Sequence, residues 1–225
     1  MKKIITIGII FCSVGIAKAQ DWANLQKYEQ ANLAQHAPTA GEKRVVYMGD
    51  SITDFWIGND PDFFNNHSYL DRGISGQTTG QMLLRFREDV INLHPDVVVI
   101  LAGINDIAEN NGPAKLEDVF GNIVSMAELA KANHIRVVLS SLLPAYAFPW
   151  RPAIDPVPKV KALNQMLKTY AGQNNIVYLD YFDAMSDARR GLPANLSKDG
   201  VHPNLQGYKV MEPLAEQAIS DALRN

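Results

Sequence analysis

The alternation of five short apolar runs with longer amphipathic stretches constrains the fold of this chain more than any other feature of its sequence. The run Asp96–Ala102 contains Val-Val-Val-Ile-Leu, which is apolar on both faces, as a central strand of a helix-covered parallel sheet must be. Four other runs predict further strands, namely Arg44–Met48, Ser68–Arg72, Ile135–Ser141 and Ile176–Asp180.

The stretches between these runs carry apolar residues at helical spacing. In Leu116–Lys131, for example, the residues Val119, Ile123, Ala127 and Ala130 fall on one face, which indicates a helix packed against a core. The same pattern predicts helices over Thr79–Asn92, Val160–Ala171 and Asn204–Leu223, and we expect an additional helix over Asp21–His36.

Strands that alternate with helices predict right-handed β-α-β units and an α/β fold. We expect three α/β/α layers around a flavodoxin-like, five-stranded parallel sheet of order 2-1-3-4-5. In such a sheet, ligands bind beyond the carboxyl ends of the strands, where the strand order reverses. The residues that follow the strands are therefore the candidates for function.

The N-terminus has the pattern of a secretory signal peptide. Basic Met1–Lys3 precedes the apolar run Ile4–Ile16, and Ala17–Ala19 matches the small-x-small cleavage rule. We expect cleavage after residue 19, export to the periplasm or the medium, and one domain over residues 20–225. The run is short for a bilayer span, so no membrane span is expected after cleavage, although an uncleaved anchor is the alternative.

The amino-acid composition excludes several classes of function. Hydrophobic residues make up 47% of the 225 residues and charged residues 20%, the balance of a folded domain. The net charge of −3 argues against a nucleic-acid partner. Cleavage would remove Cys12, the only cysteine, so a mature protein could have neither a disulfide nor a cysteine nucleophile.

Four polar segments follow predicted strands or precede the last helix, namely Gly49–Ser51, Gly73–Thr78, Gly103–Asp106 and Asp199–Pro203. In the predicted topology all four can meet at the carboxyl edge of the sheet. Ser51 is the candidate nucleophile, and a serine hydroxyl needs an adjacent base. Of five histidines, only His202 follows the last strand, and Asp199 is close enough in sequence to orient its ring.

An acyl transfer also needs donors for the oxyanion. The candidates are the backbone N–H groups of Ser51 and Gly76 and the side-chain amide of Asn105. Taken singly, each motif has a structural explanation as a turn or a helix cap. Their occurrence together, in order and at strand ends, favours catalysis. Asp50 and Asp106 are predicted to be structural, as acceptors for nearby backbone N–H groups.

These residues resemble the motif blocks of the SGNH hydrolase superfamily, also called GDSL esterases and lipases. The resemblance covers the chain from about Arg44 to its end; Ile52 stands where the family usually has leucine. It implies a flavodoxin-like fold, a Ser51–His202–Asp199 triad, and an oxyanion hole formed by Ser51, Gly76 and Asn105.

Within the superfamily, the chain is most similar to the platelet-activating-factor acetylhydrolase-like group. Exported bacterial relatives of that group often remove acetyl groups from carbohydrates, although the resemblance does not choose the substrate. Because no segment has the pattern of an amphipathic lid or interfacial helix, we expect short acyl esters, with acetyl groups on carbohydrates as the expected substrate. A lysophospholipase- or thioesterase-type acylhydrolase is the alternative. The expected partner is thus a small-molecule or oligosaccharide ester. The oligomeric state stays open.

The candidate recognition loop is Leu143–Pro158, which follows the fourth strand. It offers Tyr146, Trp150 and Arg151 for substrate binding, and its aromatic side chains could instead pack over the domain. Trp56, just after the nucleophile, is a further candidate for the pocket wall. We predict that its neighbour Phe55 joins the core.

Two other functions deserve a test. A metal-dependent phosphoesterase often uses Gly-Asp-x-x-Asp, but here Asp54 lies one position too far after Asp50, and no Asp-x-His occurs. A carbohydrate-binding module without catalysis would be expected to lose Ser51, His202 or an oxyanion donor. We therefore predict an enzyme that needs neither a metal nor a cofactor. Loss of activity in the presence of a chelator would identify the first alternative, and ligand binding without turnover would identify the second.

Overall fold

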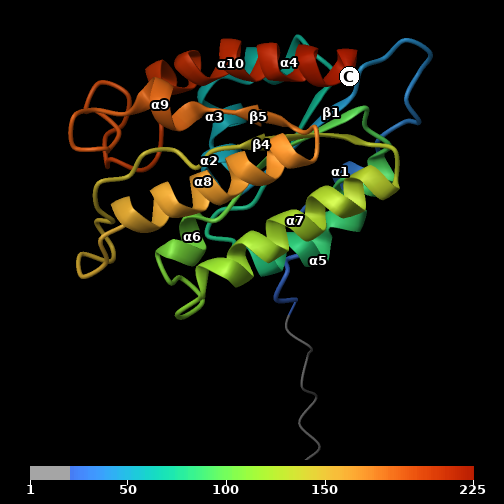
Figure 1. Ribbon diagram of the computed structural model, residues 1–225. Helices are drawn as coiled ribbons and strands as arrows, with labels where there is room; N and C mark the ends of the chain where they lie inside the picture. The colour runs from blue at the N-terminus through green and yellow to red at the C-terminus, as the bar shows by residue number, and fades with distance from the viewer. Residues whose placement is uncertain (1–20) are drawn as a thin grey trace, which may run out of the picture.

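The computed structural model describes residues 21–225 (Figure 1). The predicted signal peptide lies outside the described residues, as does Cys12. Five parallel strands form one sheet of order β2-β1-β3-β4-β5, so the predicted topology is confirmed. The strands are β1 (Val45–Gly49), β2 (Tyr69–Gly73), β3 (Val97–Leu101), β4 (Arg136–Ser140) and β5 (Val177–Leu179).

Helices cover both faces of the sheet, which gives the predicted three layers (Figure 1). One face carries α5 (Thr79–Asp89), α7 (Leu116–Ala132) and α8 (Val157–Gln173). A 3₁₀ turn, η1 (Ile91–Leu93), follows α5. The long helix α10 (Leu205–Arg224) lies on the other face with the short helices α3 (Trp56–Asn59), α4 (Pro61–Asn65) and α9 (Tyr181–Met185).

Burial explains why the periodic patterns gave the right elements. Every residue of β1 and β3 is buried, as expected for strands covered by helices on both faces. Helix α7 buries Val119, Ile123 and Ala127, which lie on the face that the sequence pattern predicted. The strongly apolar runs therefore form the hydrophobic core of the domain.

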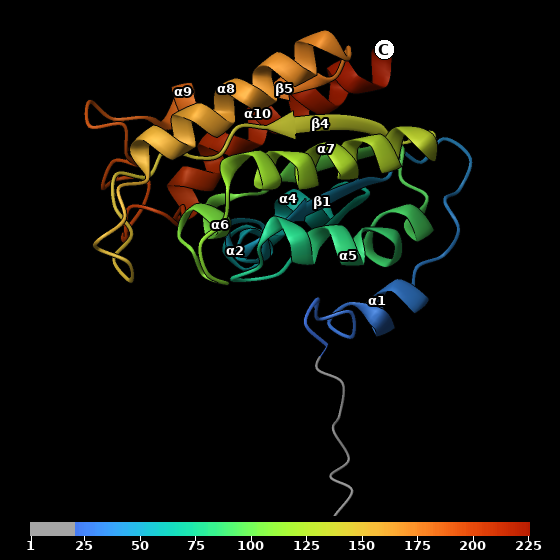
Figure 2. The same ribbon diagram turned by 60° about the horizontal axis from the view of Figure 1, so that its bottom comes forward.

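The predicted helix over residues 21–36 is much shorter in the structure. Only α1 (Glu29–Leu33) is helical, and it buries none of its side chains. Asn24 adopts a left-handed conformation with φ of 54°, which interrupts a right-handed helix at that point. Without an apolar face to bury, the segment lies beside α5 as mostly irregular chain (Figure 2).

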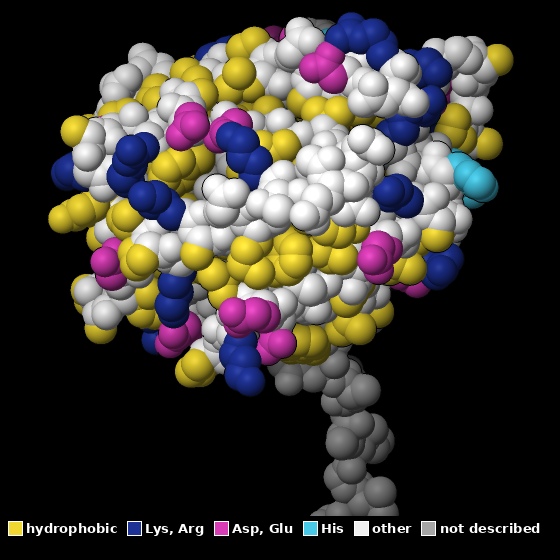
Figure 3. Space-filling model, viewed as in Figure 1, with side chains coloured by type: hydrophobic (Ala, Val, Ile, Leu, Met, Phe, Trp, Pro, Cys, Tyr) yellow, Lys and Arg dark blue, Asp and Glu magenta, His cyan; other side chains and the backbone are white. Residues whose placement is uncertain are grey.

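The carboxyl ends of the strands and the loops after them gather at one end of the molecule, where the β4 arrow points in Figure 2. Two further short helices begin at this edge, α2 (Ser51–Asp54) after β1 and α6 (Ile104–Ile107) after β3. Figure 3 shows charged side chains of both signs scattered over one face, with hydrophobic side chains gathered between α7 and α8. Within residues 21–225, no helix has the length and hydropathy to cross a membrane.

Candidate active site

Ser51 occupies the first turn of α2, directly beyond the end of β1. The Asp50 side chain caps this helix by accepting a hydrogen bond of 2.9 Å from the Ile52 N–H. In addition, the buried Tyr208 hydroxyl of α10 donates to the Ile52 carbonyl at 2.8 Å. The strand end and these two contacts fix the backbone that carries Ser51.

The structure brings Ser51, His202 and Asp199 into one hydrogen-bonded chain. Ser51 Oγ lies 2.9 Å from His202 Nε2, and His202 Nδ1 lies 2.7 Å from Asp199 Oδ2. A carboxylate accepts but does not donate, so this geometry places the ring proton on Nδ1 and leaves Nε2 to face the serine hydroxyl. This is the relationship between nucleophile, base and orienting acid that acyl transfer requires.

Asp199 is held as a carboxylate by the loop that contains it. Its Oδ1 accepts from the backbone N–H groups of Val201 at 2.9 Å and His202 at 2.8 Å. Burial alone would raise the pKa of Asp199, but the hydrogen bonds from the His202 ring and from both amides outweigh it and lower the pKa to about 2. Asp199 therefore remains negative beside the imidazole at any pH near neutrality.

Gly76 lies in the Gly73–Thr78 loop that follows β2. Its φ is +79°, a conformation that glycine adopts without strain, and a Cβ added there would meet nothing within 4 Å. Among residues 21–225, its N–H has no hydrogen-bond acceptor. The loop therefore leaves this donor available to a ligand.

Asn105 is buried in α6, and its amide is oriented from two sides. Its Nδ2 donates to the Gln77 carbonyl at 3.0 Å, while its Oδ1 accepts from Asn110 Nδ2 at 2.7 Å. Since an amide nitrogen carries two hydrogens, one remains for a further acceptor. The Gln77 contact joins this loop to the loop that contains Gly76.

The two acidic residues predicted to be structural do bond backbone N–H groups. Asp50 caps α2, and Asp106 accepts from the Thr79 N–H at 2.9 Å and from the Thr79 hydroxyl at 2.8 Å, which ties α6 to the start of α5. Burial raises the pKa of Asp50 to about 7, although the Ile52 N–H and the charge of His202 oppose this shift. Burial likewise raises the pKa of Asp106 against the hydrogen bonds from Thr79.

The two aromatic residues that follow the nucleophile, Phe55 and Trp56, have the reverse of their predicted burial. Trp56 is only 1% exposed and stacks on Phe63 at 4.8 Å and on Tyr208 at 5.2 Å between ring centroids. Phe55 is 43% exposed, with its ring centroid 5.3 Å from that of His202. The prediction that Trp56 binds substrate is therefore wrong, and so is the prediction that Phe55 joins the core. Phe55 joins α2 to α3 with a helical backbone (φ −82°, ψ −14°), so residues 55 and 56 point about 100° apart around the helix axis, and only residue 56 faces the core.

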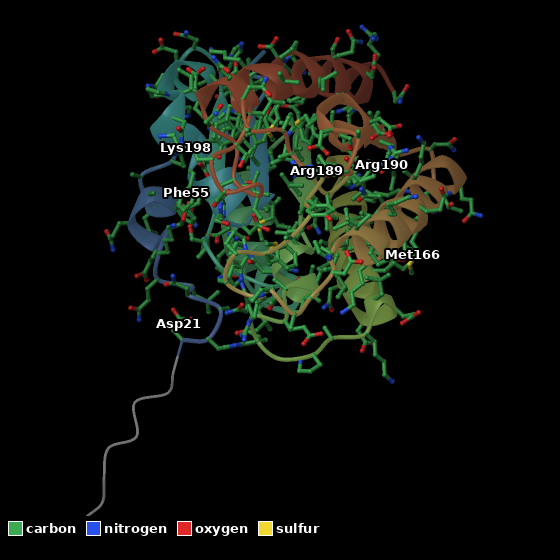
Figure 4. The ribbon with its side chains drawn as sticks, turned by 90° about the vertical axis from the view of Figure 1, so that its left-hand side faces the viewer. Asp21, Phe55, Met166, Arg189, Arg190 and Lys198 are labelled. Atoms are coloured by element: carbon green, nitrogen blue, oxygen red, sulfur yellow. The ribbon has the colours of Figure 1, made fainter. Side chains whose placement is uncertain are left out.

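Some side chains of the 143–158 loop pack against the domain, and others lie at the candidate site. Phe148 is fully buried, whereas Trp150 is 41% exposed and lies with its ring centroid 6.1 Å from that of His202. Tyr146 packs beneath the Arg189 guanidinium at 5.3 Å. Arg151 is exposed. Figure 4 looks onto this edge and labels Phe55 and Lys198 on one side, with Arg189 and Arg190 toward the other.

A cavity of about 500 Å³ adjoins Trp150 on the side of the α6–α7 connection. Arg151 and Pro152 line it from the 143–158 loop, and Glu109 and Pro113 line it from the facing segment. The indole Nε1 donates to Asn110 Oδ1 at 3.2 Å. Trp150 thus lines the cavity and also lies near His202, and a hydrogen bond links it to the residue that orients Asn105.

Two residues that sequence reasoning missed support this edge. Arg85 is fully buried and donates to the carbonyls of Gly49 and Arg72, each at 2.9 Å, while forming an ion pair with Asp89. It falls on the apolar face of its helix beside Met82, and a charge at such a position is a signal for a structural role. Asn110 gave no comparable signal, because it is one polar residue among several in a loop.

Comparison with known proteins identifies the class. The sequence profile of the GDSL-like lipase/acylhydrolase family matches residues 47–210. A putative acylhydrolase from Bacteroides fragilis is 54% identical, with 91% of this chain and all of that chain covered and a TM-score of 0.89. A GDSL-like lipase from Bacteroides thetaiotaomicron is 50% identical, with 89% and 98% covered and a TM-score of 0.87. An acetylxylan esterase from Geobacillus stearothermophilus is 27% identical over 63% of this chain and 67% of its own length.

The chain belongs to the GDSL-like lipase/acylhydrolase family, as its motif blocks predicted. It is a serine hydrolase of carboxylic ester bonds. Within the described part of the chain, no group of three or more His, Cys, Asp or Glu side chains is placed to hold a metal ion.

Proposed function

We propose that Ser51, His202 and Asp199 are the catalytic triad of a short-chain acyl esterase. The observation that carries this proposal is the hydrogen-bonded chain from Ser51 Oγ through the His202 ring to Asp199, with distances of 2.9 and 2.7 Å. A serine that only capped a helix would not need a histidine whose other nitrogen is fixed by a carboxylate.

In the acylation step, Ser51 Oγ attacks the ester carbonyl carbon and its proton passes to His202 Nε2. The imidazolium is stabilised by Asp199, and it then protonates the alkoxide oxygen as the C–O bond breaks and the alcohol leaves. The acyl group stays on Ser51 as an ester. In the second step a water molecule attacks this ester, and its proton goes to Nε2. Ser51 recovers the proton, and a carboxylic acid is released.

Both steps place negative charge on the former carbonyl oxygen. We assign the N–H groups of Ser51 and Gly76 and the Nδ2 of Asn105 as its donors, because they lie at the ends of adjacent strands or in the loops after them. The contact between Asn105 and the Gln77 carbonyl, at 3.0 Å, sets these two loops against each other. Donors fixed in this way do not reorganise during the reaction, which is the source of their effect.

Hydrolysis of p-nitrophenyl acetate by the protein from residue 20 onward, with and without a chelator, tests the mechanism. The wild type should turn over the ester, and Ser51→Ala should abolish turnover while melting normally. The chelator should have no effect. Turnover that survives in Ser51→Ala would contradict the nucleophile, and loss of activity with the chelator would favour a metal-dependent hydrolase.

We further propose that the natural substrate is an acetylated carbohydrate. The distant relative from Geobacillus stearothermophilus is an acetylxylan esterase, and the exposed Trp150 offers a flat apolar surface beside His202. The adjoining cavity of about 500 Å³ combines apolar walls with charged Glu109 and Arg151. Such a mixture of flat apolar surface and a few polar groups suits a sugar ring.

Two comparisons test the substrate. We expect kcat/KM to fall steeply from p-nitrophenyl acetate to the octanoate, and acetylated xylo-oligosaccharides to be turned over faster than a lysophospholipid or an acyl thioester. Trp150→Ala should raise KM for the oligosaccharide more than for p-nitrophenyl acetate, since the small ester does not reach the cavity. Equal effects on both substrates would contradict a sugar-binding role.

The N-terminal pattern supports a separate proposal, that the protein is exported and cleaved after Ala19. Met1–Lys3, the apolar run after it and the small residues before Gln20 carry this proposal. The intact mass of the protein recovered from the periplasm or medium of its host tests it. A chain that begins at Gln20 is expected, and a full-length chain in the membrane fraction would contradict cleavage.

A further inference from the structure

We propose that the N-terminal segment, residues 21–35, is a positioning element of the oxyanion hole. It fixes the Gly73–Thr78 loop from outside the sheet and so sets the direction of the Gly76 N–H. The inference rests on the proposed function, because it takes this N–H as an oxyanion donor. The segment lies before residues 47–210, which carry the family pattern.

The segment contacts the start of the loop through one carbonyl. Gly73 O accepts from the Tyr28 hydroxyl at 2.5 Å and from Lys27 Nζ at 3.3 Å. Burial raises the pKa of the Tyr28 hydroxyl, and the charges of Asp71 and Asp54 add to the effect, so the group stays protonated and remains a donor. Two side chains of the segment therefore hold the point at which the loop leaves β2.

A second contact reaches the residue before Gly76. Lys27 Nζ pairs with Asp54 Oδ1 at 2.7 Å, and Asp54 Oδ2 accepts from the Ser75 N–H at 3.0 Å and from the Ser75 hydroxyl at 2.6 Å. Burial alone would raise the pKa of Asp54, but its bonds to Lys27 and Ser75 outweigh it and lower the pKa. The carboxylate thus links the segment to the backbone of Ser75.

A third contact holds the residue after Gly76. Gln77 is buried, and its Nε2 donates to the Ala23 carbonyl at 2.6 Å while its Oε1 accepts from the buried Arg85. The Gln77 carbonyl is also the acceptor for Asn105 Nδ2. The segment therefore secures the residue that both follows one oxyanion donor and orients the other.

Gly76 has nothing of its own to hold it. It has no side chain, the space at its Cβ position is open, and its N–H has no acceptor within residues 21–225. Its position is set by Ser75 and Gln77 on either side. Since displacement of a catalytic group by about 1 Å can cost on the order of 10²-fold in rate, even slight loosening of these anchors lowers kcat.

The segment does not act by filling the core. Helix α1 buries no side chain, and the larger apolar side chains of the segment, Trp22, Leu25 and Leu33, are exposed, so that only the small side chain of Ala23 is buried. What the segment supplies to the loop is polar, namely two donors and one carbonyl acceptor. A loss of these bonds should therefore affect turnover more than the stability of the sheet.

The test compares Tyr28→Phe with Tyr178→Phe in the protein from residue 20 onward. Tyr178 is a matched control, because its partly buried hydroxyl also donates to a carbonyl, that of Asn164 at 3.3 Å, but lies on β5 away from the loop. For each variant we would measure kcat and KM with p-nitrophenyl acetate, and amide hydrogen exchange over residues 73–78. Ser51→Ala is included to establish that turnover depends on the proposed nucleophile.

We expect Tyr28→Phe to lower kcat about fivefold to tenfold with KM within about twofold, since it displaces a group that acts in the transition state. Exchange over residues 73–78 should become faster. Tyr178→Phe should change neither. Lys27→Met, which weakens the same carbonyl contact and the Asp54 link, should lower kcat in the same way, so the result does not depend on one variant that folds poorly.

Wild-type kcat in Tyr28→Phe, or an equal loss in Tyr178→Phe, would overturn the inference while Ser51-dependent turnover leaves the proposed function intact. Faster exchange over the loop without a loss of kcat would overturn it as well, because the loop would then be free to move without consequence. Turnover that does not depend on Ser51 would instead refute the proposed function, and the role of Gly76 with it.

Discussion

The loops that follow β2 and β3 each carry a proposed oxyanion donor, and they are held by different means. The loop after β3 is held partly by a near neighbour in sequence, since Asn110 bonds the Asn105 side chain directly, and partly by Thr79, which lies 27 positions before Asp106. The loop after β2 is held by the segment 21–35, whose contacts lie 45 and 54 positions away, and by Arg85, which lies 8 positions after Gln77. A side-chain donor can be oriented by hydrogen bonds to its own amide, whereas a backbone donor moves with its whole loop and needs support on both sides.

The largest expected effect is on the side-chain donor. Asn105→Ala removes one oxyanion donor, so kcat for p-nitrophenyl acetate should fall by about 10²–10³. The control is Asn164→Ala, which removes another buried asparagine, one that bonds the Leu142 N–H at 2.7 Å and its carbonyl at 3.2 Å. It should lower the melting temperature with little change in kcat. A loss of less than threefold in Asn105→Ala would remove this residue from the oxyanion hole.

The backbone donor, the Gly76 N–H, is tested by a substitution that strains its conformation rather than by one that removes the donor. Gly76→Ala keeps the N–H but places a Cβ on a residue with φ of +79°, which costs roughly 1–2 kcal/mol. Gly41→Ala is the matched control, because Gly41 has φ of +85°, equally open surroundings and no part in the site. Both variants should lose similar stability, and only Gly76→Ala should lose kcat, by about tenfold. Equal kcat values in the two variants would mean that Gly76 has no role in turnover.

The fold followed from the sequence because its signals are local. A run such as Val97–Leu101, apolar on both faces, can be satisfied only at the centre of a covered sheet. The polar residues of the site were predictable for the same reason, since the carboxyl ends of parallel strands share one edge. Ser51, Asn105, Asp199 and His202 needed only the strand order to be brought together.

The parts that the sequence did not predict depend on details of packing. Phe55 and Trp56 are adjacent aromatic residues, and the way their helical turn is rotated against the core decides which of them is buried. The contact of Tyr28 with the Gly73 carbonyl joins positions far apart in the chain, and no periodic pattern marks it. Side chains in irregular segments carry little sequence signal for the partners they will meet.

Asn110 allows the local support of Asn105 to be weakened without touching the donor itself. Asn110→Asp replaces the Nδ2 donor by a carboxylate oxygen, which repels Asn105 Oδ1 at what was a 2.7 Å hydrogen bond. The Asn105 amide should then turn from its working orientation, and kcat should fall about fivefold to tenfold with a small change in KM. Steady-state kinetics of Asn110→Asp and Asn110→Ala measure this. An aspartate variant as active as wild type would show that Asn105 is oriented by Gln77 alone.

A substitution of Asp71 is expected to have the smallest effect on turnover, and its main effect is on stability. The Asp71 Oδ1 accepts from the Gly73 N–H at 2.6 Å, where the loop leaves β2. Burial raises the pKa of Asp71 to about 7, and the charge of Asp54 adds to the shift against the Gly73 hydrogen bond and the charges of Lys27 and Arg72. A carboxyl group whose pKa is higher in the folded state contributes most to stability at low pH. It loses that contribution as the pH rises through 7.

Asp71→Asn keeps an oxygen for the Gly73 N–H but cannot ionise, so its free energy of unfolding should lack this dependence. Between pH 5 and pH 7 the wild type should lose roughly 2 kcal/mol relative to the variant, given about 1.4 kcal/mol for each unit of pKa shift that is expressed. Urea unfolding at several pH values measures the difference. Parallel pH profiles would mean that Asp71 stays ionised. The loop after β2 would then begin at a fixed negative charge, and Tyr28 and Lys27 would support it electrostatically as well as by hydrogen bonds.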